Sequence, residues 1–195
     1  AVAESVKTLA WRYAVCADPF PKRMPRSEAE PKFRQRISSI TDQMSDKIIF
    51  DNSDSVISDT MSALRKLSFK ERRDAYVQGR TLEQREWYSK KARANQQRAT
   101  ASWTLLTIVE IVAIILAVGR IFGRWNFDFA GLLAATISAG TAWVAVKQYS
   151  SLASAYSVAT KELGIQASKL ETVNEADWAV VAADAEEAIS REHTT

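Results

Sequence analysis

Two long apolar segments near the middle of the chain constrain its fold more than any other feature. Between residues 103 and 146 the sequence is almost wholly apolar, whereas both flanks are rich in Lys, Arg, Asp and Glu. This segregation is typical of a chain in which one part is solvated by lipid and the rest by water. The hydrophobic content of 47% is therefore an average over a part that is solvated by lipid and a part that is solvated by water.

The lengths of the two segments predict a transmembrane hairpin. As a helix, residues 103–118 would rise about 24 Å, which is short of the hydrocarbon core of about 30 Å. Extension through Phe122 makes up the difference, because the aliphatic stem of Arg120 can carry its charge to the far interface. The second segment, residues 127–146, is long enough without extension. We therefore assign a hairpin to residues 101–146 and expect the lipid bilayer to be its partner.

The basic residues near the hairpin predict its orientation. Seven Lys and Arg residues flank the two spans on the outside, against two, Arg120 and Arg124, in the connection between them. Since the side richer in Lys and Arg stays in the cytoplasm, we expect both ends to be cytoplasmic and the hairpin to cross the cell inner membrane. Four of the flanking cations are also candidates for binding anionic headgroups at the membrane surface: Lys90, Lys91, Arg93 and Arg98.

Helical periodicity continues on both sides of the hairpin. A cytosolic helical extension over residues 1–70 contains all four prolines, and its polar run, residues 18–32, is predicted to be a Pro-rich linker that cannot continue a helix. A cytosolic arm over residues 71–100 enters the first span without proline, and Gly79 is its weak point. Residues 147–195 supply the second arm and a terminal helix. The predicted fold class is an all-α membrane protein.

The two arms are expected to run antiparallel, as long helices continuous with the hairpin. Residues 60–100 hold 11 basic and 4 acidic side chains, whereas residues 148–195 hold 3 basic and 8 acidic ones, so we expect the first arm and the tail to dock on each other. Asn174 and Asp177 resemble a cap that opens the terminal helix. Four side chains are predicted to lie on facing sides of the arms: Trp87, Tyr88, Leu152 and Tyr156.

Glu110 lies near the middle of the first span, where a charged carboxylate costs a few kcal/mol unless it faces water or a partner. On the second helix, small and weakly polar residues recur along one stripe, which lets helices approach closely. These stripes predict a homo-oligomer. Two roles for Glu110 stay open, lining a water-filled pore or forming a hydrogen bond across a helix interface. The candidate pore or helix-interface residues are Thr107, Glu110, Ala134, Ser138 and Thr141.

The chain offers no catalytic set. Cys16 and His193 are the only residues of their kinds, and no zincin, P-loop or Ser/His/Asp pattern surrounds either of them. We therefore expect no enzyme, no metal site and no cofactor. Membrane orientation explains the basic residues and no nucleic-acid motif accompanies them, so we expect no nucleic-acid partner.

A group of residues immediately before the hairpin follows a recognisable order: Tyr76, Arg80, Gln84, Trp87, Tyr88, Lys91, Ala92 and Asn95. This order resembles the SLATT family, the two-transmembrane proteins associated with bacterial nucleotide-signalling conflict systems. Residues 3–20 and 183–194 are similar to the N-terminal extension and the tail of the same family.

The resemblance implies an oligomeric pore-forming or membrane-disrupting effector of a bacterial antiphage or self-harming defence system, gated by a cytosolic signal. It further implies that a sensor domain or a second transmembrane hairpin can precede such a segment, and it brings no catalytic residues. The alternative is a non-conducting membrane anchor or scaffold whose cytosolic helices bind a partner.

Overall fold

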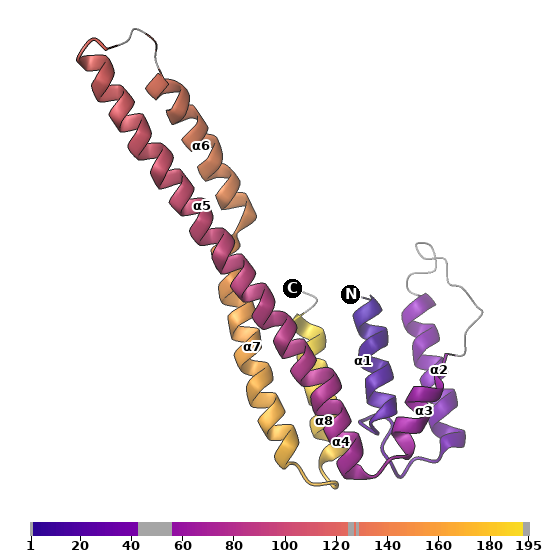
Figure 1. Cartoon of the computed structure of the whole chain (residues 1–195). Helices are drawn as coiled ribbons and strands as arrows, with labels where there is room; N and C mark the ends of the chain where they lie inside the picture. Colours follow the sequence, from indigo (N-terminus) through magenta and orange to yellow (C-terminus); the bar gives the residue numbers. More distant parts are fainter. Residues whose placement is uncertain (1, 43–55, 125–126, 128, 193–195) are drawn as a thin grey trace. The chain divides into compact units, whose positions relative to one another are not determined.

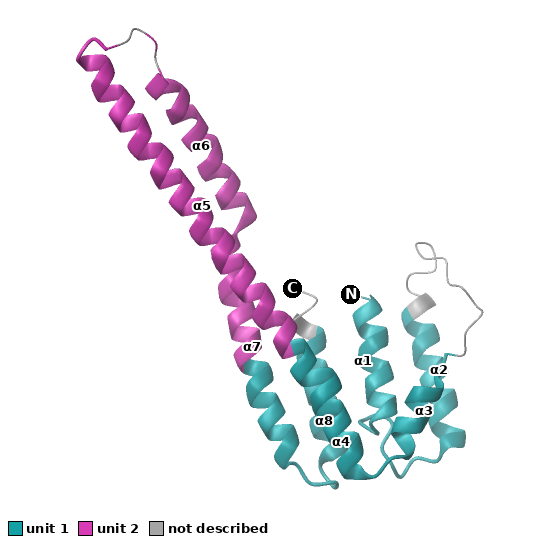
Figure 2. Ribbon diagram, viewed as in Figure 1, with its two compact units in different colours: residues 1–84, 162–195 teal, residues 85–161 magenta. Residues whose placement is uncertain are grey.

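The fold is helical throughout the part of the chain that the structure describes. The computed structural model describes residues 2–42, 56–124, 127 and 129–192 (Figure 1), and every regular element in these ranges is a helix. The chain divides into two compact units, one formed by residues 1–84 and 162–195 and the other by residues 85–161 (Figure 2). The predicted all-α fold class is confirmed.

The bounds of the described helices, in chain order, are α1 Val2–Ala14, α2 Arg26–Asp42, α3 Asp59–Lys66, α4 Phe69–Tyr76, a π-helical turn Val77–Leu82, α5 Glu83–Ile121, α6 Phe129–Lys147, α7 Tyr149–Thr172 and α8 Trp178–Glu192. His193, which carried no role in the expectations above, lies outside the described residues.

In the first unit, buried side chains gather in two clusters. One brings together Tyr76, Leu170 and Trp178, and its contact with α1 is fixed by a hydrogen bond of 2.7 Å from the Trp178 indole nitrogen to the Val15 carbonyl. The other packs Tyr13 against the aromatic rings of α2 and of the connection that precedes it. α1 therefore contributes to both clusters, through Trp11 in the first and through Leu9 and Tyr13 in the second.

The predicted Pro-rich linker over residues 18–32 is wrong in its second part, because α2 begins at Arg26 and contains Pro31. Proline removes one backbone hydrogen bond and its ring crowds the preceding turn. Burial compensates for that cost, since Ala29 and Phe33, on either side of the proline, are almost fully buried in the second cluster. Tertiary packing thus overrides the local preference of a proline-containing sequence.

The helix that enters the hairpin begins earlier than predicted and is not uniform. α4 starts at Phe69, where Ser68 and Glu71 form a reciprocal capping box. A π-helical turn then inserts around Gly79, the weak point that the sequence indicated. The side chain of Trp11 lies against this glycine, because a Cβ atom there would be 3.4 Å from the indole ring. This distance is an ordinary van der Waals contact, so α1 packs directly on the π-helical turn.

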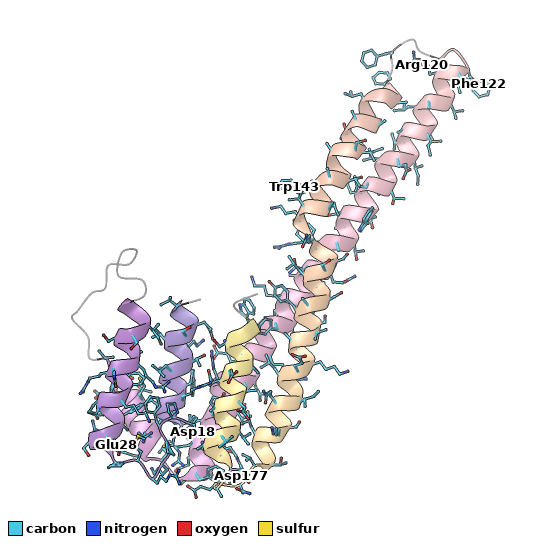
Figure 3. All side chains as sticks on the ribbon, turned by 180° about the vertical axis from the view of Figure 1, so that it is seen from behind. Asp18, Glu28, Arg120, Phe122, Trp143 and Asp177 are labelled. Atoms are coloured by element: carbon cyan, nitrogen blue, oxygen red, sulfur yellow. The ribbon has the colours of Figure 1, made fainter. Side chains whose placement is uncertain are left out.

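In the second unit, α5 and α6 lie side by side and form the hairpin (Figure 1). The helices that contain α5 and α6 are long and apolar enough to cross a membrane, and none of their most apolar residues is buried within the chain. Figure 3 places Arg120 and Phe122 at the connected end of the hairpin. Lipid is the solvent that suits apolar side chains exposed in this way.

Candidate functional site

Half-buried side chains mark the contact face of the hairpin. They recur at three- and four-residue spacing on both helices, as expected of an antiparallel helical pair. Leu106 lies against Gly140, since a Cβ atom on Gly140 would lie only 2.8 Å from Cδ2 of Leu106. The half-buried contact residues used below are Leu106, Val109 and Ala113 on α5 and Leu133, Ile137, Gly140 and Val144 on α6.

Each predicted pore or interface residue directly follows one of these contact residues. A step of one residue rotates the side chain by about 100° around its helix. Because α5 and α6 run in opposite directions, residues that follow contact residues on either helix turn toward the same side of the pair. This side, here named the polar flank, is exposed in the single chain and contains Thr107, Glu110, Ala134, Ser138 and Thr141, with Ile114 and Ala145 at its ends.

The opposite side of the hairpin has different chemistry. Residues that precede a contact residue turn to this side, here named the apolar flank. Large exposed side chains dominate it, and Figure 3 shows Trp143 projecting from α6. The apolar flank contains Thr136 and Ala139 and a larger set of exposed apolar side chains: Leu105, Ile108, Val112, Leu132 and Trp143. A hairpin with one large, apolar flank and one small, weakly polar flank is suited to lipid on the first and to protein or water on the second.

Glu110 differs from the other polar side chains of the flank. The hydroxyl of Ser138 donates to the Ala134 carbonyl at 3.0 Å, and that of Thr141 donates to the Ile137 carbonyl at 2.9 Å, so their own helix satisfies both. Within the described residues, Glu110 makes no hydrogen bond and no ion pair. A carboxyl group in the hydrocarbon region therefore needs a partner or water that one hairpin does not supply.

The four predicted membrane-surface cations are all exposed along α5. Arg98 precedes Trp103 by five residues, which is about 7.5 Å of helix rise, whereas Lys90 is about 20 Å away. The polar layer on each side of the hydrocarbon core is only about 5–8 Å thick. Lys90 instead pairs with Glu86 at 2.7 Å, and Lys91 lies over the Trp87 ring. Arg98 is thus the best placed of the four to contact headgroups.

Aromatic packing joins the arms within the second unit. The ring of Tyr156 on α7 lies 5.9 Å from that of Tyr88 and 6.1 Å from that of Trp87. The predicted facing positions are confirmed for these three residues, whereas Leu152 is partly exposed. Ala92 and Asn95 are buried on the same face of α5. The motif that precedes the hairpin therefore serves helix packing.

A buried polar network in the first unit was not predicted from the amino-acid sequence. The Arg80 guanidinium donates from Nε and Nη2 to the two carboxylate oxygens of Glu186, each at 2.9 Å, and both side chains are fully buried. Nη2 also lies 2.7 Å from Glu4 on α1, and the hydroxyl of Tyr76 donates to Glu186 at 2.9 Å. One arginine on the π-helical turn thereby joins α1 to α8.

Electrostatics of this network follow from burial and pairing. Burial, reinforced by the nearby charge of Glu186, raises the pKa of Tyr76 well above its ordinary value of 10.0. Burial alone would lower the pKa of Arg80, but the bonds and charges of Glu186 and Glu4 outweigh it and raise that pKa. The predicted docking of the basic arm on the acidic tail is confirmed here, and by the ion pair of Arg72 with Glu175.

A metal site or a disulfide would require suitable side chains among the described residues. There, no group of three His, Cys, Asp or Glu side chains lies where it could hold a metal ion. Cys16 is buried and forms no disulfide. The side chains that the structure assembles therefore support packing, ion pairing and membrane contact.

Comparison with protein-family models gives two matches. Residues 76–195 match SMODS and SLOG-associating 2TM effector domain 1, and residues 1–73 match SMODS and SLOG-associating 2TM effector domain 3. No curated protein and no solved structure matches the chain. The first match spans more than half of the chain and includes both helices of the hairpin.

Proposed function

This chain belongs to the SLATT family of two-transmembrane effectors, and from that premise we propose that copies of it assemble in the membrane with their polar flanks turned inward, to form a pore or a membrane-disrupting complex. The observation that carries the proposal is the position of Glu110. It shares one exposed flank with small and hydroxyl side chains, while the other flank is large and apolar. Two helices cannot enclose a water-filled channel, so the proposal requires several copies.

The biological setting of the proposal follows the family. The complex would act in a bacterial antiphage or self-harming system, in the inner membrane, with both ends of this chain in the cytoplasm. A cytosolic signal would gate it, received through a sensor domain or a second hairpin in the full-length protein. The proposal gives the chain no catalytic role and no cofactor.

The test compares two hydroxyl residues on opposite flanks. Ser138 and Thr136 are both exposed, and each donates to a carbonyl of its own helix at 3.0 Å. Ser138 lies on the polar flank, whereas Thr136 directly precedes the contact residue Ile137 and lies on the apolar flank. Leucine enlarges the side chain at either position, more at Ser138 than at Thr136, and the two positions lie on opposite flanks.

We expect the wild-type chain to be an oligomer by mass in detergent and to release ions from liposomes. Ser138→Leu should lower the oligomer fraction and the ion flux at least tenfold, because bulk on a closely packed flank separates the helices. Thr136→Leu should leave both unchanged. A monomeric particle without flux, or equal damage from the two variants, would overturn the proposal and favour the non-conducting anchor.

A further inference from the structure

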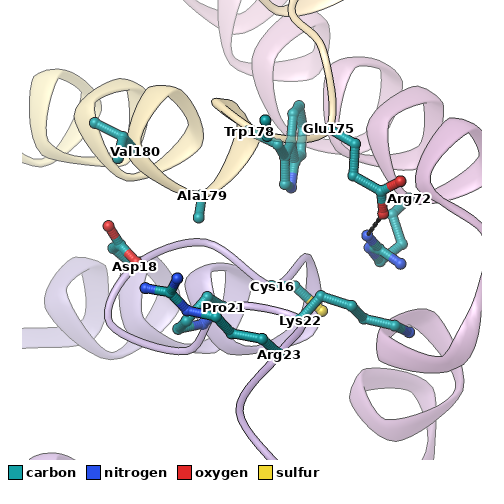
Figure 4. Close-up of a pocket in the computed structure, with 11 residues that line it drawn as sticks. Cys16, Asp18, Pro21, Lys22, Arg23, Arg72, Glu175, Trp178, Ala179 and Val180 are labelled. Carbon is teal, nitrogen blue, oxygen red and sulfur yellow. Dashed lines mark ion pairs between the residues drawn. The ribbon is translucent and has the colours of Figure 1, made fainter.

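A pocket of about 400 Å³ opens in the first unit, away from the residues of the polar flank. The connection between α1 and α2, the helix α4 and the turn before α8 form its walls (Figure 4). Its volume lies within the range of about 300–1,000 Å³ that is usual for small-molecule sites. The membrane function proposed above makes no use of it.

Arg72 is the side chain that most needs a partner in this pocket. It is 1% exposed, and a buried guanidinium is costly unless its donors are satisfied. Nη1 donates to the Leu67 carbonyl at 2.6 Å. Nε has no hydrogen-bond partner within the described residues, and Nη2 lies 3.5 Å from a carboxylate oxygen of Glu175, which is an ion pair beyond good hydrogen-bond length.

The partner that Arg72 does have is easily displaced. The Glu175 side chain is 62% exposed, and in Figure 4 it reaches the guanidinium from the turn before α8. Because the carboxylate is solvent-exposed and lies at 3.5 Å, this ion pair is weaker than a short, fully buried one. A ligand anion could therefore take the place of this carboxylate at little cost, while Glu175 turned into solvent.

The charges of the pocket match a dianion once Glu175 has left. Three cations line it, Arg72, Lys22 and Arg23, against the single remaining carboxylate of Asp18, so the wall carries a net charge of +2. Lys22 donates to the carbonyl of Arg65 at 2.7 Å, a neutral partner that leaves its charge uncompensated. Within the described residues Arg23 forms no ion pair.

We propose that this pocket binds a small phosphate monoester, whose dianionic head lies against Arg72 and Lys22 in the position that the Glu175 carboxylate now holds. Arginine suits a tetrahedral oxyanion because its guanidinium offers several donors in one plane. Apolar atoms of Pro21, Ala179 and Val180 also line the pocket, and they are available to the organic part of the ligand.

The test measures binding of two probes, inorganic phosphate and phenyl phosphate, to the full chain in a non-ionic detergent. Isothermal titration at constant ionic strength separates a defined site from general screening. Both probes should bind saturably, with phenyl phosphate tighter, and acetate should bind at least tenfold more weakly because it carries one charge.

Two exposed positions supply the informative variants, since Arg72 is buried and its loss could unfold the chain. Glu175→Gln should tighten phosphate binding about fivefold by removing the competing carboxylate, and Lys22→Gln should weaken it about fivefold. Glu171→Gln and Lys70→Gln, which remove exposed charges outside the pocket lining, should leave the dissociation constant unchanged. Any other pattern, including no saturable binding or equal binding by all four variants, overturns the proposal.

Discussion

Arg80 and Glu110 are charged side chains in apolar surroundings, and the chain accommodates them in opposite ways. Arg80 is fully buried and meets the carboxylates of Glu186 and Glu4 at hydrogen-bond distance. Glu110 projects from an apolar span and has no ion-pair partner among the described residues. The charge of Arg80 is paired within one chain, although its Nη1 has no hydrogen-bond partner among the described residues, whereas Glu110 requires a partner or water from outside the hairpin.

Substitution of Glu110 should separate its two candidate roles. In a water-filled pore, Glu110→Gln should reduce the preference for cations and leave assembly intact, because water solvates either side chain. If Glu110 instead forms a hydrogen bond across a helix interface, Glu110→Gln should be nearly silent, and Glu110→Leu should weaken the oligomer by about 1 kcal/mol through the lost intramembrane hydrogen bond. Ion flux in liposomes and particle mass in detergent measure both effects. If neither variant alters conductance, Glu110 does not line the pore.

Tyr76 should make stability depend on alkaline pH. Its pKa is raised in the folded state, so above pH 10 the unfolded chain loses this proton while the folded chain keeps it. The contribution of Tyr76 to the free energy of unfolding is therefore fully present below pH 10. Above pH 10 it falls by about 1.4 kcal/mol per pH unit. Tyr76→Phe should cost about 1.5 kcal/mol at pH 8, for the hydrogen bond to Glu186, and close to nothing at pH 11.

The measurement is denaturant unfolding of the full chain at pH 8 and pH 11, with Tyr156→Phe as the control. Tyr156 is half-buried and has no carboxylate partner within the described residues. A cost of Tyr76→Phe that stays constant between the two pH values would show that burial does not hold this hydroxyl protonated.

At the scale of elements, two glycines each lie against a side chain of a neighbouring helix. Gly79 lies on the π-helical turn and receives the ring of Trp11, and Gly140 receives the side chain of Leu106. The π-helical turn also carries Arg80, so the same irregularity that accommodates α1 brings the guanidinium to α8. Such turns are rare and are often found at functional positions.

The contact between Gly140 and Leu106 should behave as a coupled pair. Gly140→Ala places a methyl group 2.8 Å from a Leu106 methyl carbon, and a shift of that flexible side chain should limit the cost to about 1 kcal/mol. In a Leu106→Ala background the same change should cost nothing, since the clash is gone. A double-mutant cycle of unfolding in detergent measures the coupling. Additive costs would mean that the two helices do not meet at this position.

At the scale of the whole molecule, the chain combines a lipid-solvated hairpin with helices packed around buried polar and aromatic groups. The hairpin belongs to the second unit and its apolar side chains are exposed. The first unit holds a conventional core in which Trp178 and Tyr76 are buried. The hairpin is therefore suited to lipid, and the first unit is suited to water.

Orientation is the testable property at this scale. Seven cations flank the hairpin on one side and two on the other. A reporter that works only in the cytoplasm should therefore be active when fused after Thr195, and a reporter that works only in the periplasm should be inactive there. A reporter inserted after Gly123, in the connection between the spans, should show the reverse. Periplasmic activity at Thr195 would contradict the predicted orientation.

The amino-acid sequence by itself determined the two spans, the helical class and the cap of the terminal helix. A membrane span depends on a local run of apolar residues, so it can be predicted without knowledge of any tertiary contact. The cap is equally local, because the Asn174 side chain accepts from the backbone of Asp177 three residues later. The facing rings of Trp87 and Tyr156 followed from helical periodicity in the two arms.

Only the tertiary structure decided which partners these residues meet. Arg80 pairs with Glu4 and Glu186, which are 76 and 106 positions away, and no local pattern selects them from the other acidic residues. The helix through Pro31 persists because its neighbours are buried. The polar flank exists because the register of two antiparallel helices turns Glu110 and Ser138 to the same side. Each of these outcomes depends on contacts between distant segments, whose free energies outweigh local preference.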